Sequence, residues 1–100
     1  LAPVQVKILP LSETHREYAR KVKEILKNAD IRVELDERDE KIGYKIREAT
    51  MQKIPYMLIL GDKEVEANAV GVRSRKDGDI GQMSIEDFIN KIQEEVKDFA

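Results

Sequence analysis

Five consecutive apolar residues, Tyr56–Leu60, constrain the fold of this chain more than any other segment. The run is short for a helix and stops at Gly61 and Asp62, a pair typical of turns. A strand that is apolar at every position is typical of a sheet covered on both faces, whereas a strand covered on one face alternates. We therefore expect this segment to be the central strand of an α/β domain.

Hydrophobic periodicity on either side of this strand predicts the other elements. Apolar residues at positions 4, 6 and 8 and at 31, 33 and 35 alternate with polar ones, as in half-buried strands. Helical spacing follows Ser12, recurs over residues 42–53, and recurs after the capping-box pattern at Ser84. Val70 and Val72 mark a further strand. This order predicts an open sheet with helices on both faces and binding residues outside the carboxyl ends of its parallel strands.

The composition describes one soluble domain. With 100 residues, 41% of them hydrophobic, the chain can bury one core but not two. It has no cysteine, no long apolar run and no signal-peptide pattern, so we expect a cytoplasmic protein with no membrane partner and no disulfide. We predict a single domain over residues 1–100 that is a monomer when isolated.

Residues suited to catalysis are scarce. The only histidine, His15, falls in the first turn of a predicted helix, where we expect it at the surface without a catalytic partner. One histidine and no cysteine give no zinc ligand set, and the carboxylates lack calcium-loop spacing. The glycines form no phosphate-binding loop. We expect no catalytic residue, no metal and no cofactor in this domain.

Charge is distributed unevenly, although the net charge is only −2. Five cations and three acids lie between Arg38 and Lys53, whereas two cations and five acids lie between Ser84 and Asp98. A chain with this balance would contact nucleic acid through a local site, because it lacks a bulk positive field. The alternative is that the charges cover solvated faces.

An exposed RNA loop is recognised through hydrogen bonds to base edges, stacking, and cations at phosphates. Arg47 and Arg73 offer planar guanidinium donors, and Glu64 offers an acceptor for the N–H groups of guanine. Lys41 and Lys45 are close to these in sequence and suit phosphate contacts. These five residues are therefore candidates for RNA contact.

The same residue types have structural explanations. Arg47 could form an ion pair within the protein, Glu64 could be a turn residue, and Arg73 could protect the edge of a sheet. Tyr44 and Tyr56 have apolar neighbours and are expected mainly in the core, although Tyr44 could also serve as a stacking surface. Chemistry alone leaves both interpretations open.

Four motifs carry a resemblance to a known family: LAPVQV at the start, R-x-EKIGYKIREA from Arg38, QKIPYMLILGDKEVE from Gln52, and VGVRSR from Val70. In this order, and over all 100 residues, the chain resembles the C-terminal anticodon-binding domain of bacterial threonyl-tRNA synthetase. QKIPYM or GDKEVE alone would be similar only to the wider class II group that includes the histidyl-, prolyl- and glycyl-tRNA synthetases. The resemblance implies a three-layer α/β/α fold with a mixed sheet of about five strands and three helices, the short fifth strand falling near residues 80–82.

The resemblance also implies a function and a site. It implies recognition of the anticodon loop of threonine tRNA, within a threonine–tRNA ligase whose catalytic domain is the second partner. Threonine anticodons share a guanine and a uracil in their second and third positions. In the family, the positions matching Asp39, Arg47, Glu64 and Arg73 lie at or beside the anticodon-reading surface. The expected RNA-binding residues are Asp39, Lys41, Lys45, Arg47, Glu64 and Arg73.

Two positions depart from the family pattern. Asp39 stands where relatives commonly have asparagine, so a group that only accepts hydrogen bonds replaces one that also donates. Asp30 follows the first helix where relatives usually have glycine, which tolerates a left-handed conformation better. Two other functions remain open: a protein-interaction or accessory module of the same fold, and a redesigned scaffold that keeps the fold without the binding.

Overall fold

The computed structural model describes the backbone of residues 4–99 and the side chains of residues 4–95. The strands, in chain order, are β1 (Val6–Pro10), β2 (Val33–Leu35), β3 (Tyr56–Leu60), β4 (Ala69–Ser74) and β5 (Gly78–Ser84). The helices are the 3₁₀ turn η1 (Glu13–His15), α1 (Arg16–Asn28), α2 (Ile42–Met51), α3 (Asp62–Ala67) and α4 (Ile85–Phe99). None of the described helices is long and apolar enough to cross a membrane.

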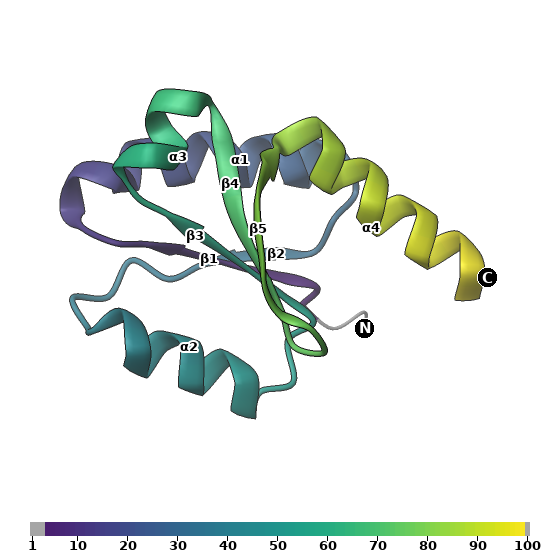
Figure 1. Cartoon of the computed structure of the whole chain (residues 1–100), viewed down its shortest axis with the longest axis horizontal. Helices are drawn as coiled ribbons and strands as arrows, with labels where there is room; N and C mark the ends of the chain where they lie inside the picture. The colour runs from purple at the N-terminus through teal and green to yellow at the C-terminus, as the bar shows by residue number, and fades with distance from the viewer. Residues whose placement is uncertain (1–3, 100) are drawn as a thin grey trace.

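The five strands form one mixed sheet in the order β2-β1-β3-β4-β5 (Figure 1). β1 pairs in parallel with β2 and β3, whereas β3–β4 and β4–β5 are antiparallel. The predicted mixed five-stranded sheet, with the apolar strand β3 at its centre, is confirmed. The three predicted helices correspond to α1, α2 and α4. The short helix α3 lies where the sequence indicated only a turn, because Glu64 caps its first turn by accepting a hydrogen bond from the N–H of Gly61.

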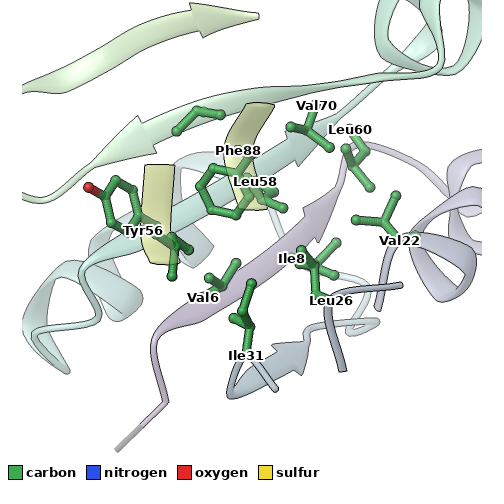
Figure 2. Close-up of a cluster of buried hydrophobic side chains, with 13 residues drawn as sticks. Val6, Ile8, Val22, Leu26, Ile31, Tyr56, Leu58, Leu60, Val70 and Phe88 are labelled. Atoms are coloured by element: carbon green, nitrogen blue, oxygen red, sulfur yellow. The ribbon is translucent and has the colours of Figure 1, made fainter. Parts of the chain in front are cut away.

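Helices cover both faces of the sheet, which gives the expected three layers. α1 and α4 cover one face and α2 covers the other (Figure 1). On the first face, side chains of β1, β3 and β4 pack against Val22 and Leu26 of α1 and against Phe88 of α4 (Figure 2). On the second face, Leu9 and Met57 pack against Ala49 of α2. Burial of apolar surface on both faces is the main stabilising contribution to this fold.

The prediction that the first strand is half buried is wrong, because α2 covers its second face. All five residues of β1 are buried, including Lys7, which is 3% exposed. Its ammonium donates to Gln52 Oε1 at 3.3 Å and lies 3.4 Å from Glu34 Oε1. The polar residue that marked a solvent-facing position is thus an ion-paired lysine beneath a helix.

Three of the described helices end in left-handed residues that are not glycine, and at the end of α3 this residue is Asn68, with a φ of 51°. α2 stops at Met51, and Lys53 then adopts a φ of 61°. α1 stops at Asn28, and Asp30 adopts a φ of 63°. Asp30, where the resemblance led us to expect glycine, therefore has a backbone conformation that costs less with glycine.

Candidate functional site

The face of the sheet that carries α2 has a hollow of about 230 Å³ between β3, β4, β5 and α3. Two predicted site residues reach it from different elements: Glu64 from α3 and Arg73 from β4. Its lining residues are Ile59, Glu64, Gly71, Val72, Arg73, Asp79, Gly81 and Gln82. The tertiary structure thus brings a carboxylate and a guanidinium to one cavity, although nine positions separate them in sequence.

The Glu64 carboxylate is held by a donor on each oxygen. Oε1 accepts from the backbone N–H of Gly61 at 2.8 Å, and Oε2 accepts from Nε2 of Gln82 at 3.2 Å. An ionised carboxylate has about four lone-pair directions, so both oxygens keep capacity for a further donor. Glu64 is therefore half-buried, oriented and still able to accept from a ligand.

Gly71 keeps this hollow open. A Cβ at that position would lie 2.9 Å from the carbonyl oxygen of Ile59 and 3.7 Å from the carboxyl carbon of Glu64. The first of these atoms belongs to the central strand and cannot move without distorting the sheet. The absent side chain therefore makes room beside Glu64 and Arg73.

A second hollow, of about 220 Å³, lies at the carboxyl ends of the parallel strands β1 and β2. It is lined by Pro10, Leu11, Ser12, Glu13, Arg16, Arg38, Asp39, Glu40 and Lys45. Asp39 and Lys41 are both exposed in the loop between β2 and α2, and Arg47 is exposed on α2. The loop after β2 thus occupies the carboxyl edge where the sequence placed it.

An ion-pair network orders this loop. Arg38 donates from Nε to Oδ1 of Asp36 at 2.9 Å and from Nη2 to Oδ2 at 2.7 Å, and it also contacts Glu48 Oε1 at 2.6 Å. The Arg38 guanidinium holds the pKa of the buried Asp36 carboxyl below its usual range, and it lowers the pKa of Glu48 in the same way. Both acids are therefore ionised at neutral pH, and Asp39 follows directly on this anchored arginine.

Lys45, for which the sequence predicted a phosphate contact, has a buried side chain. It is 3% exposed, and its ammonium donates to the carbonyl oxygen of Asp36 at 3.3 Å. The reason is helical phase: Lys45 and Ala49 are the buried residues of α2. Its position favours a structural role in holding the loop after β2.

The two tyrosines behave differently from each other. Tyr56 is buried, as expected, packs edge-on against Phe88 and donates its hydroxyl to Glu95, and burial raises its pKa. Tyr44 is 50% exposed, with the Arg38 guanidinium 5.9 Å from its ring centroid, so its assignment to the core is wrong. Tyr44 instead presents an aromatic surface beside the loop after β2.

His15 is also placed differently from the prediction, because it is 8% exposed and has partners. Its Nε2 is 2.7 Å from Oδ1 of Asp62, and its Nδ1 is 3.0 Å from Oγ of Ser12. The backbone N–H of Ser12 also donates to Nδ1 at 3.2 Å, which occupies the lone pair that a general base would need. The set of serine, histidine and aspartate is therefore a cap of η1, tied to the start of α3.

Gln82 was not among the predicted site residues. Its hydrogen bond to Glu64 spans 18 positions and joins β5 to α3, so no local pattern in the sequence signals it.

Comparison with known proteins identifies the family of the chain. The family described as "Anticodon binding domain" matches residues 5–95. The threonine–tRNA ligase of Caldanaerobacter subterraneus subsp. tengcongensis is 68% identical over 96 residues, covering 96% of this chain and 15% of the relative. That of Clostridium botulinum strain Hall is 64% identical over 97 residues, covering 97% of the chain and 15% of the relative. The chain thus spans about 15% of the length of these relatives.

Solved structures show the same similarity. The RNA-binding domain of threonyl-tRNA synthetase from Cryptosporidium parvum superposes with a TM-score of 0.84 at 32% identity, over 93% of this chain and 24% of that one. Prolyl-tRNA synthetase from the same organism superposes with a TM-score of 0.85 at 27% identity, over 98% of this chain and 22% of that one. From the family match, the sequence identities and the shared fold together, the chain belongs to the anticodon-binding domain family and is similar to that domain of bacterial threonine–tRNA ligases.

Proposed function

We propose that this domain binds the anticodon loop of threonine tRNA and works as one part of a threonine–tRNA ligase. The observation that carries the proposal is the convergence of Glu64 and Arg73 on one hollow, in a chain of the anticodon-binding family. The catalytic domain of such a ligase would be its other partner. The domain itself would act in the cytoplasm, as a monomer when isolated, and would need no cofactor of its own.

The two side chains have complementary chemistry toward guanine. The Glu64 carboxylate is an acceptor for the N1–H and N2–H groups of the base, and the Arg73 guanidinium is a donor for O6 and N7. The hollow of about 230 Å³ is below the usual range for drug-sized ligands, which suits one base better than a whole nucleotide. The guanine shared by threonine anticodons at the second position is the base we assign to it.

The remaining contacts would come from the loop after β2 and from α2. Asp39, Lys41 and Arg47 are exposed there, and the aromatic face of Tyr44 is available for stacking. Lys41 suits a phosphate, since a flexible ammonium works as a point charge. Lys45 would contribute indirectly, by holding the carbonyl of Asp36 at the base of the loop.

The test compares a variant that should lose recognition of the base with a variant that should lose only a charge near the phosphates. Arg73→Ala should weaken binding of a threonine anticodon stem-loop by roughly 1–3 kcal/mol and reduce the preference for guanine at the second position. Lys41→Ala should weaken all loops to a similar extent and lower the salt dependence by under about one unit. Binding is measured by fluorescence titration at two salt concentrations, on matched loops and on loops altered at that guanine.

Lys91→Ala on α4 is the matched control, because it removes a cation from the opposite face of the sheet. Equal effects of Arg73→Ala and Lys91→Ala on every loop would contradict base recognition. If neither the unchanged domain nor a longer chain that also carries the catalytic domain binds RNA, that result would favour a protein-interaction module or a scaffold without binding.

A further inference from the structure

In the described part of the chain, Gln82 is the residue of β5 whose side chain donates a hydrogen bond to the carboxylate of Glu64. We propose that Gln82 is a positioning residue that orients Glu64 toward the two adjacent N–H donors of a guanine. It would thereby set the preference of this domain for guanine over bases that lack the exocyclic amine. This inference rests on the proposed function and adds a residue that tunes the selectivity provided by Glu64 and Arg73.

The direction of the Gln82–Glu64 hydrogen bond follows from its chemistry. A carboxylate only accepts, so the group of Gln82 that faces Oε2 at 3.2 Å must be its amide nitrogen. The other carboxylate oxygen is held by the backbone N–H of Gly61 at 2.8 Å. Donors on both oxygens limit rotation of the carboxylate before any ligand binds. Binding a base therefore costs less conformational entropy than it would with a freely rotating glutamate side chain.

The position of Gln82 in the sheet explains how it can reach Glu64. In the register of β4 and β5, Gln82 lies opposite Gly71. Because Gly71 has no side chain, nothing at that position fills the space between β5 and α3, and a Cβ there would lie 3.7 Å from the carboxyl carbon of Glu64. The absence of a side chain at Gly71 thus leaves the space through which the side chain of Gln82 reaches Glu64.

The placement of Gln82 favours a role in the site over a role in stability. Its side chain is exposed, it belongs to neither hydrophobic cluster, and it lines the same hollow as Arg73. A bond between an exposed amide and a half-buried carboxylate contributes little to folding, since water replaces it readily. Its effect should therefore appear in the geometry of Glu64.

If Gln82 orients Glu64 in this way, the domain should bind a loop with guanine more tightly than the same loop with inosine. Inosine keeps N1–H and O6 of guanine but lacks the N2 amine. A carboxylate fixed in the plane of the base accepts from both N1–H and N2–H, whereas one free to rotate gains less from the second donor. Gln82 should thus affect the guanine–inosine ratio more than the affinity for the loop as a whole.

The experiment measures dissociation constants for anticodon stem-loops with guanine, inosine or adenine at the second anticodon position. Gln82→Ala is expected to reduce the guanine–inosine ratio about three- to tenfold, the range for one net hydrogen bond. Gln82→Glu keeps the size but places a second carboxylate beside Glu64, so it should reduce guanine binding further. Gln93→Ala, which removes an exposed glutamine from α4, is the control and should leave the ratio unchanged.

A double-mutant cycle shows whether Gln82 acts through Glu64. Glu64→Gln should lose the guanine–inosine preference, and adding Gln82→Ala to it should change the ratio no further. Thermal unfolding of each variant, measured in parallel, detects any loss of fold.

A Gln82→Ala variant that keeps the full guanine–inosine ratio, while Glu64→Gln loses it, overturns the inference and leaves the proposed function standing. If Glu64→Gln and Arg73→Ala both bind all loops as the unchanged protein does, the proposed function itself fails.

Discussion

Arg38 holds Asp36 through two parallel hydrogen bonds, from Nε to Oδ1 at 2.9 Å and from Nη2 to Oδ2 at 2.7 Å. The aspartate follows β2 and is buried, whereas the arginine is exposed and also reaches Glu48 on α2. Bidentate pairs of this kind fix geometry as well as contribute energy. The pair therefore joins the end of β2 to α2 and sets the path of the loop that carries Asp39.

The first prediction concerns the pH dependence of this pair. Because Arg38 lowers the pKa of Asp36 in the folded state, the stability it contributes is present above the unfolded pKa of about 3.9 and is lost as the pH falls through the folded value. Asp36→Asn should lower the free energy of unfolding by roughly 1.5–3 kcal/mol at pH 7, since it removes hydrogen bonds to a charged group. Urea unfolding between pH 7 and pH 2 should show this difference shrinking below about pH 4. A difference that stays constant to pH 2 would contradict the assignment.

The second prediction tests the centre of the sheet. Leu58 is fully buried in β3, which has strands on both sides. Leu58→Ala should therefore lower the free energy of unfolding by roughly 2–5 kcal/mol, measured by urea denaturation. Ile25→Ala, at a position that is 43% exposed on α1, should change it by only about 0.5 kcal/mol. Similar losses for the two variants would be inconsistent with a central β3.

The third prediction concerns the end of α1. Asp30 adopts a φ of 63°, a conformation in which a side chain costs energy and glycine does not. Asp30→Gly should stabilise the protein by about 0.5–1 kcal/mol and raise the midpoint of thermal unfolding, whereas Asp30→Ala should not raise it. A lower midpoint for the glycine variant would show that the Asp30 side chain contributes more than the strain costs.

The fourth prediction concerns Asp39, at a position where the resemblance to the anticodon-binding family leads us to expect asparagine. Its carboxylate is exposed and lines the hollow at the carboxyl ends of β1 and β2. Asp39→Asn should tighten binding of the anticodon loop, because it removes repulsion from phosphates and restores a donor. Glu40→Gln, which removes a neighbouring exposed charge in the same loop, is the control. If both variants bind the loop more tightly to the same extent, the cause is a general charge effect. If Asp39→Asn does not bind the loop more tightly, position 39 lies outside the contact with RNA.

Much of the architecture could be predicted from local patterns. The apolar run of β3 indicated a covered central strand, and the helical spacing after Ser12 and Ser84 indicated α1 and α4. Local patterns work here because the period of apolar residues records which face of an element is buried. The same reasoning failed for Lys7 and Tyr44, because it could not say which other element would cover them.

For the candidate site, the sequence determined which chemical groups are available: Glu64 and Arg73 have complementary chemistry toward a base in any fold that joins them. Only the tertiary structure decided that they line one hollow, that Gln82 reaches Glu64, and that Lys45 turns inward. The physical reason is that these relations depend on strand register and on the phase of α2 against the sheet. Such contacts between distant segments are set by packing of the whole domain and leave no periodic signal in the chain.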